Sequence, residues 1–566
     1  MHNHHLNLRA KVIIMLSVMA SLFLVALDQT IVTTALGRIV EDLHAFSSLS
    51  WIVTAYMLTT TVTVPIAGKL SDLFGRKIML LIGVAVFGLA SLMCGTSDSI
   101  TTLVLWRAAQ GVGAGIITAN AFTIIGDLFA ARERGKWQGM FGAVFGLSSI
   151  VGPLLGGWLT DHHSIFGLQT SWHWIFWINV PIALIAFALI ATFCPPLRHS
   201  RNPQVDYTGG MLLTLALGTL VLAVDNTEQI FHNVLTSTGW SLLTLRAIMF
   251  GIVLAATLGF AVRQKRAPEP ILPPHFFQNR NYSLIMLVAT LFGAGFMGSI
   301  IYLTQFNQQV FGATPTQSGL MLLPMIAGMM VSSIGSGQLI TRTGHYKKFM
   351  QTGIILTTVM IATLATLTPD TSYVQEAVQM CLLGLGLGLV LPVINIAIQN
   401  EFEQKNLGAA TSSIQLFRGL GSTVGIAVFG AMLTSGLASH LGQAKDNTYL
   451  NMLARNPMAS KRFQDLTDTN TMLTLNMPSV RDGIRTSALK GIESSPLPKA
   501  IKEQQKQTFI QAQDEYSSLI THAFSESIRN IFLASAALMA PATALVYATK
   551  ERELKSASAH TTPGEA

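Results

Sequence analysis

Residues 101–157 contain two long apolar runs. Each run also contains residues that a water-soluble helix would not tolerate there. A lone arginine, Arg107, lies inside the first run. The second run contains Gly146, Gly152, Pro153, Gly156 and Gly157. In a bilayer, an isolated charge usually marks a transport pathway, and small residues let helices pack closely. The stretch therefore predicts membrane-spanning helices with a role in transport.

The composition agrees with a chain that crosses a bilayer many times. Half of the 566 residues are hydrophobic and 11% are charged, whereas about 25% of the residues in soluble domains are charged. Apolar segments of about 20 residues can span a membrane. The sequence has fourteen of them, at 12–36, 49–68, 78–97, 101–128, 138–160, 172–194, 207–226, 241–262, 282–307, 316–339, 349–369, 372–400, 408–438 and 523–548. An even number of spans places both termini on one side.

Basic residues predict which side that is. With the amino terminus inside, the inner connections contain most of the loop lysines and arginines, whereas the short outer loops hold Arg38. This bias indicates cytoplasmic termini in a cell membrane, and it explains the net charge of +8 without a nucleic-acid partner. The three cysteines lie in apolar runs and the histidines form no evident cluster, so we expect neither disulfides nor a metal site.

The chain also repeats itself. The GLSSIVG sequence at 146–152 recurs as GLGSTVG at 419–425, and Gly68, Leu70 and Gly75 recur as Gly337, Leu339 and Gly344. Matching loops fall on the same side, so we predict two parallel six-helix repeats with the segments 207–226 and 241–262 inserted between them. The predicted units are 1–206, 207–281 and 282–566. The last contains a long outer loop, 439–522, which is either an ordered hairpin or an excursion without a role.

These motifs resemble those of a known family. The sequences GKLSDLFGRK (68–77), WRAAQGVGAG (106–115) and GLSSIVGPLLGG (146–157) resemble signature motifs of the major facilitator superfamily. With fourteen spans, LDQTIVTTAL (27–36) and WHWIFWINVP (172–181) look like its drug/proton antiporter branch. The resemblance implies an all-α membrane protein of the major facilitator fold that exports drugs. The family's acidic residue in the tenth helix is absent from 316–339, which weakens doubly charged drugs as substrates.

Asp28 and Arg107 are the predicted proton-coupling residues. Asp28 is the one acidic residue deep in the first half, and the two lie roughly 12 and 9 Å below the outer surface at 1.5 Å per residue. Burial favours the protonated form of Asp28 and a nearby Arg107 favours the ionised form, so a small rearrangement could switch its protonation. A static ion pair is the alternative. If Asp28 does exchange a proton, protons are the coupling ion. No cofactor is expected, because the chain lacks a GxxxxGK[ST] phosphate loop.

Two motifs have predicted conformational roles. The loop motif and its partner comprise Gly68, Asp72, Gly75, Arg76 and Asp127. Its glycines permit close turns. The resemblance implies that its charged residues hold the inner gate closed. Orientation of the loop by its basic residues is the alternative. In the fifth span, the resemblance assigns the antiporter motif to Gly146, Gly152, Pro153, Gly156 and Gly157. Close helix packing is the alternative.

We expect a substrate cavity at the midplane, between the two halves. Its candidate lining residues are Asn120, Gln305, Asn307, Asn395, Gln399, Gln415 and Arg418, with the methionines of 321–330. Ordinary bundle packing is the alternative, and Arg418 could face the inner interface. The favoured function is proton-coupled efflux of hydrophobic, amphiphilic or cationic small molecules by a monomer. A lipid exporter and a membrane sensor that has lost transport remain open, and an enzyme is not expected.

Overall fold

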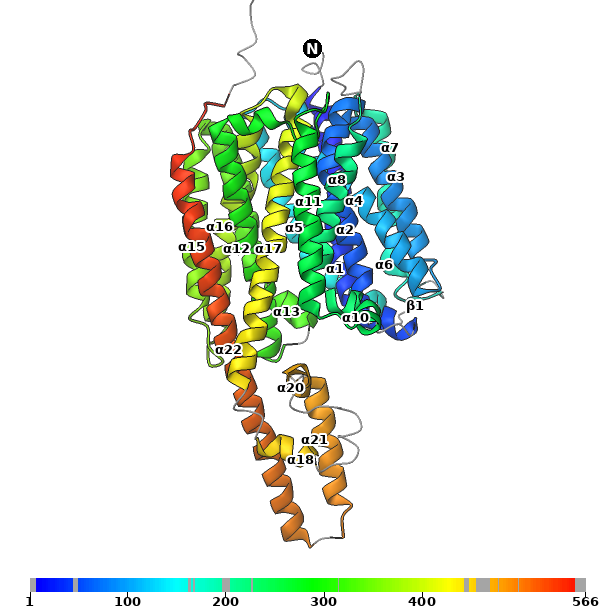
Figure 1. The fold of residues 1–566 in the computed structure, drawn as a ribbon, viewed down its shortest axis with the longest axis vertical. Helices are drawn as coiled ribbons and strands as arrows, with labels where there is room; N and C mark the ends of the chain where they lie inside the picture. The colour runs from blue at the N-terminus through cyan, green and yellow to red at the C-terminus, as the bar shows by residue number, and fades with distance from the viewer. Residues whose placement is uncertain are drawn as a thin grey trace, which may run out of the picture.

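A computed structural model describes residues 7–43, 49–160, 164–165, 168–195, 204–224, 227–313, 315–441, 447–454, 469–476, 478–496 and 498–554. Most of these residues form helices that stand side by side in one bundle (Figure 1). The first helix begins and the last helix ends at the same end of the bundle, at the top of Figure 1. We call this end the terminal face and the other end the opposite face.

The first half of the chain forms a bundle around buried apolar side chains. Its helices are α1 (Leu8–Asp42), α2 (Leu49–Phe74), α3 (Arg76–Cys94), α4 (Ile100–Leu128), α5 (Arg134–Thr160), α6 (Trp174–Trp177) and α7 (Asn179–Phe193). A two-residue antiparallel pair, β1 (Ser164–Ile165) and β2 (Leu168–Gln169), lies between α5 and α6. Helix α5 continues through Pro153, so the proline does not end it.

The second half repeats this arrangement. Its elements are η2 (Pro274–Gln278), α12 (Arg280–Gln309), α13 (Pro315–Met321), α14 (Leu323–Thr343), α15 (Lys347–Leu364), α16 (Tyr373–Gln399), η3 (Gln404–Asn406), α17 (Leu407–Leu441) and α22 (Lys499–Ala548). In the first half α1 packs on α5 and α2 on α4, and in the second half α12 packs on α17 and α14 on α16. The halves meet where α5 packs on α14 and α2 on α17. These matching contacts are those of the predicted repeat, and they confirm the major facilitator fold.

Between the halves lies a helix pair that has no counterpart in either repeat. It consists of α8 (Tyr207–Val224) and α11 (Leu242–Gln264), joined through the short helices α9 (Thr227–Ile230) and α10 (His232–Thr238). Helix α8 packs on α2 of the first half and on α17 of the second. At the terminal face, Asp206 accepts hydrogen bonds from the Gly209 amide at 3.0 Å and from Arg263 Nε at 2.9 Å. The pair therefore closes one side of the interface between the halves.

Thirteen of the described helices are long and apolar enough to cross a membrane. The remaining predicted span, 349–369, corresponds to α15, which has 18 residues and begins with Lys347 and Lys348. Helix α15 stands in the bundle beside α16 and α22 (Figure 1). The protein is a multi-pass membrane protein, and the exact number of fourteen spans stays a prediction.

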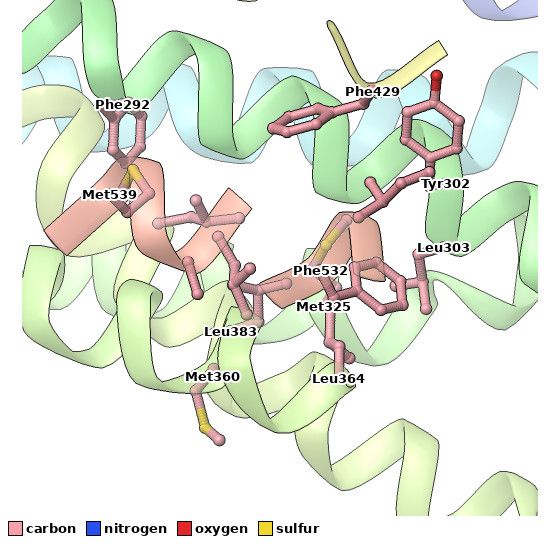
Figure 2. Close-up of a cluster of buried hydrophobic side chains, with 14 of the residues drawn as sticks. Phe292, Tyr302, Leu303, Met325, Met360, Leu364, Leu383, Phe429, Phe532 and Met539 are labelled. Carbon is pink, nitrogen blue, oxygen red and sulfur yellow. The ribbon is translucent and has the colours of Figure 1, made fainter. Parts of the chain in front are cut away.

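The core of the second half combines aromatic and methionine side chains with leucine, isoleucine, valine and alanine. Figure 2 shows Phe292 of α12 beside Met539 of α22, and Met325 of α14 beside Phe532 of α22. Met539 is fully buried, and a Cβ on Gly295 would lie 2.5 Å from its Cγ. Apolar side chains gain little from leaving lipid, so such cores are stabilised by close packing. This packing fixes α22 to the second half.

The segment 439–522 contains an ordered helical hairpin beyond the opposite face (Figure 1). Its helices are α18 (Thr448–Ala454), α20 (Thr469–Asn476), α21 (Pro478–Glu493) and the first half of α22. Arg485 of α21 donates to Gln513 of α22 at 2.5 Å, and Tyr516 donates to the Met472 carbonyl at 2.9 Å. Helix α22 has 50 residues and runs unbroken from the hairpin into the bundle.

Candidate functional site: a buried ion pair and a gate

Asp28 and Arg107 form an ion pair inside the first half. Arg107 Nη1 donates to Asp28 Oδ2 at 2.5 Å, and the two residues are 1% and 0% exposed. Arg107 Nε also donates to the Ile52 carbonyl at 3.2 Å. The guanidinium lies over the Tyr56 ring, 4.2 Å from its centroid, where the ring face attracts a cation. The predicted pairing between α1 and α4 is therefore present.

Uncharged polar side chains complete this site. Gln110 Nε2 donates to Asp28 Oδ1 at 2.9 Å, and Asn179 Nδ2 donates to the same oxygen at 3.2 Å. Both amides also donate to Ser91 Oγ, at 2.9 and 3.0 Å. Gln110 in turn accepts from Arg107 Nη1 at 2.7 Å. Helices α1, α3, α4 and α7 thus each supply one or more groups to a single hydrogen-bonded cluster.

This geometry makes the packing of the four helices depend on both charges of the pair. A buried ion pair is stable while both charges are present, and loss of one partner typically costs 3–5 kcal/mol because the other charge stays buried. Protonation of Asp28 would leave Arg107 in that situation. The four helices that hold the cluster would then have to shift until Arg107 finds another acceptor or reaches water.

The glycine motif of α5 packs against the helix that carries Asp28. A Cβ on Gly152 would lie 2.0 Å from Thr30 Oγ1, and a Cβ on Gly156 would lie 2.0 Å from Thr34 Oγ1. Thr30 also donates to the Ser148 carbonyl at 3.0 Å. These glycines therefore allow α5 to lie directly on α1.

The other two glycines of the motif have different surroundings. Gly146 faces the second half, because its Cβ would lie 2.7 Å from Ile326 Cγ2. A Cβ on Gly157 would meet nothing within 4 Å. Close helix packing, the alternative interpretation of the motif, therefore fits Gly156 but not its neighbour Gly157.

At the terminal face, the loop motif forms a second charged cluster. Arg76 Nε donates to Asp127 Oδ2 at 2.8 Å, and the Arg76 guanidinium also pairs with Asp72. Gly75, with a φ of 100°, makes the turn between α2 and α3. Asp72 accepts from two backbone amides of the second half, Gly408 N at 2.9 Å and Ala409 N at 2.8 Å.

Further contacts join the two halves at this face. A Cβ on Gly68 would lie 2.2 Å from Ser412 Oγ, so α2 and α17 are in direct contact. Gln399 of α16 donates to the Phe122 carbonyl and accepts from Gln138, both at 2.9 Å. Arg132 donates to the Thr341 carbonyl at 2.8 Å. In this conformation the terminal face is closed.

The predicted cavity residues occupy several environments. Gln399 belongs to the contacts of the closed terminal face, and Arg418 donates to Gln415 on the same helix. Asn120 and Asn395 are buried and donate to carbonyls of their own helices, at 2.8 and 3.1 Å. Gln305 is half-buried, and Asn307 is fully buried. The structure does not gather the seven into one pocket lining.

Two cavities border the inserted helix α8. One, of about 540 Å³, lies between α2 and α8 and is lined by Lys69 and Tyr207 among others. The other, of about 360 Å³, lies between α8, α11 and α17. Within the described ranges, no group of three or more His, Cys, Asp or Glu side chains gathers as metal ligands do.

The sequence patterns indicate the charged members of the cluster but not Ser91, Gln110 and Asn179. Gln110 lies one helical turn after Arg107, and Asn179 falls inside the WHWIFWINVP motif, so both had a signal. Ser91 had none, because serine is common in membrane helices.

The fold and the site define a membrane transporter of two repeated halves, and comparisons with known proteins agree. A profile described as the Major Facilitator Superfamily matches residues 18–426. The chain belongs to the major facilitator superfamily.

Two relatives from Bacillus subtilis (strain 168) are similar over most of their length. The multidrug transporter protein MdtP is 36% identical over 451 residues, which cover 80% of each chain. Multidrug resistance protein 3 is 34% identical over 433 residues, which cover 76% of this chain and 81% of the relative. The crystal structure of the human organic anion transporter MFSD10 (TETRAN) has a TM-score of 0.57 at 13% identity, over 94% of this chain and 99% of that one. This last likeness concerns the fold alone.

Proposed function

We propose that this transporter exports small amphiphilic molecules in exchange for protons, by alternating access. The observation that carries the proposal is the fully buried Asp28–Arg107 pair inside the first half. Ionisable residues within membrane helices are costly and usually belong to ion or proton pathways. The names of the two bacterial relatives, a multidrug transporter and a multidrug resistance protein, support drug-like molecules as substrates.

The proposed cycle begins from the conformation described here. With the terminal face closed, a proton that reaches Asp28 breaks its pairing with Arg107, and the first half repacks along α1 and α5. The repacking separates α2 from α17, and the substrate site then opens to the terminal face. Release of the proton on that side restores the pair. Each proton that moves down 100 mV supplies about 2.3 kcal/mol, enough for a roughly 50-fold gradient of an uncharged substrate, whereas export of a monovalent cation is driven by the pH difference.

Placement in the cell follows from the same proposal. Basic residues gather in the loops of the terminal face, so this face and both termini are cytoplasmic, and the membrane is the cell membrane. The chain is expected to work as a monomer.

Lipid export would favour an apolar track along the hairpin. Among the described hairpin residues, Ile501 is the one large hydrophobic side chain that is exposed. Drug-like substrates are therefore preferred over lipids.

The test is uphill efflux of ethidium from proteoliposomes with an imposed proton gradient. Wild-type protein should lose this efflux when the gradient is collapsed. Asp28→Asn should reduce it to the level of empty vesicles, because the amide cannot exchange a proton. The matched control is Asp98→Asn, which removes an exposed carboxyl from the loop between α3 and α4 and should leave efflux unchanged. A single cooperative thermal transition in each variant shows that it is folded, even though Asp28→Asn should unfold at a lower temperature because Arg107 stays buried. If Asp28→Asn exports ethidium at the rate of the wild-type protein, the proposal is refuted.

A further inference from the structure

A second buried carboxyl group lies in the other half of the molecule. Glu376, in the first turn of α16, is 0% exposed, and neither carboxyl oxygen has a hydrogen-bond partner. The side chain of Asn307, near the end of α12, faces it. Asn307 is also 0% exposed, and both polar atoms of its amide lack partners. The two groups face each other, but not within the geometry of a hydrogen bond.

Among the described side chains of the surrounding helices, no basic group pairs with Glu376. Helix α16 begins at the opposite face, whereas most charged residues of α5, α12, α14 and α15 lie at the terminal face; these are Arg134, Lys136, Arg280, Arg342, Lys347 and Lys348. Arg418 lies eleven residues into α17, far from that end. The titratable neighbour is Tyr373, on the same helix.

Such a site does not suit an ionised carboxylate. A buried carboxylate without a hydrogen bond or a cation costs several kcal/mol, and such groups take up a proton instead. The amino-terminal end of α16 offers a partial positive charge, worth about 0.3–1 kcal/mol, which is less than that cost. The neutral acid suits the site, because its O–H can donate to Asn307 Oδ1 while Asn307 Nδ2 donates to the other carboxyl oxygen.

We infer that Glu376 and Asn307 form a second proton-binding site, which is loaded in the conformation described here. The proton comes from water at the opposite face and binds one carboxylate oxygen of Glu376. It leaves to water when the second half repacks and the carboxyl group becomes hydrated. The inference rests on the proposed proton coupling, and it adds that each half carries one protonatable carboxyl group.

A route for the proton lies next to the pair. A cavity of about 300 Å³ opens at the opposite face and is lined by Ala313 and Tyr373. The Ala313 amide donates to the Asn307 carbonyl at 3.0 Å, and Tyr373 precedes Glu376 by one helical turn. The Tyr373 hydroxyl donates to the Met321 carbonyl at 3.3 Å, and Tyr373 both lines the cavity and interacts electrostatically with Glu376. A rotation of Tyr373 would connect the two.

The experiment uses the purified full-length protein and needs no transport. Infrared difference spectra on acidification should contain the C=O stretch of a protonated carboxyl group that is absent from Glu376→Gln. Asn307→Ala should keep this band but shift it, because the hydrogen bond is lost. The control Glu515→Gln removes an exposed carboxyl group of α22 and should leave the band unchanged. A band that persists in Glu376→Gln overturns the inference.

Proton release on ethidium binding is the second readout, measured in weakly buffered solution. Wild-type protein should release one proton more than Glu376→Gln, and equal release would refute the role in coupling. A band that responds to sodium rather than to pH would identify a metal-cation site and also overturn the inference. A failure of the proposed function is distinguished from a failure of this inference, because the proposed function is tested by the efflux of Asp28→Asn.

Discussion

Asp72 of the first half accepts a hydrogen bond from the backbone amide of Ala409 in the second half, at 2.8 Å, although the two residues are 337 positions apart. Its other carboxylate oxygen accepts from Gly408 N at 2.9 Å. Helix α17 begins at Leu407, so these amides belong to the first turn, where no carbonyl of the helix can accept from them. A side chain of one half thus caps a helix of the other, with its negative charge at the positive end of the helix.

Asp72→Asn is expected to open the terminal face. The amide keeps one acceptor but loses the charge, which should cost about 1–2 kcal/mol and increase the open population roughly 5- to 30-fold. Spin labels at the exposed positions Glu133 and Thr343, which lie beside α5 and on α14, measure the separation of the halves. The control Glu403→Gln removes an exposed carboxylate that pairs with Lys405 at the same face. An unchanged distance distribution in Asp72→Asn would contradict the capping role.

Gly68→Ala should also separate α2 from α17. A Cβ there would lie 2.2 Å from Ser412 Oγ and 2.9 Å from the Gly408 carbonyl, so the helices must move apart. Ser412→Gly removes the nearer obstacle and should restore part of the closed population in the double variant. The same label pair measures this. Gly218→Ala on α8 is the control, because its Cβ meets nothing within 4 Å. If the double variant is as open as Gly68→Ala, the contact between residue 68 and Ser412 is not what separates α2 from α17.

Adjacent glycines of α5 should differ in their tolerance of alanine. Gly156→Ala places a methyl group 2.0 Å from Thr34 Oγ1 and 2.9 Å from the Ile31 carbonyl, and overpacking of this kind costs about 1–3 kcal/mol. Gly157→Ala meets nothing within 4 Å and should be neutral or stabilise the helix by up to about 1 kcal/mol. Thermal unfolding in detergent compares the two. Equal midpoints would show that α5 is not held against α1 by this motif.

Asp206 should make the stability of the α8–α11 pair depend on pH. Burial raises the pKa of Asp206, but the Gly209 amide, Arg263 and Gln264 together lower that pKa below its ordinary value. The folded state therefore favours the ionised form. Its contribution is complete above the unfolded pKa of about 3.9 and is lost as the pH falls through the folded pKa.

Asp206→Asn should accordingly be less stable than wild type near neutral pH, by about 1 kcal/mol for a helix cap. The difference should shrink under acid conditions. Thermal unfolding midpoints at neutral and acid pH measure it. A difference that stays constant with pH would show that the charge of Asp206 plays no part.

Charged residues in apolar runs were the most informative sequence signals. Asp28 and Arg107 could be paired from their similar depth, because few polar partners exist inside a membrane bundle. The glycine repeats likewise predicted the two halves and the inserted pair. Both inferences depend on patterns within single helices, which the sequence expresses directly.

Contacts between distant helices could not be predicted in the same way. The cap of α17 by Asp72 depends on one conformation of the two halves, and no local pattern encodes it. The fully buried position of Glu376 was missed because the residue lies near the start of its predicted span, where charges commonly face water. The length of α22 was missed because its first half is polar and was assigned to a loop.

Because helix α22 is unbroken, the hairpin moves as a rigid extension of the second half. The part before residue 523 has about 24 residues and extends roughly 36 Å beyond the opposite face, at 1.5 Å per residue. Because Met539 and Phe532 fix the other end of this helix in the second half, a 10° tilt of that half would swing the hairpin tip by about 6 Å, given this length. Rocking of the second half should therefore be measurable outside the membrane, at the distal end of the hairpin.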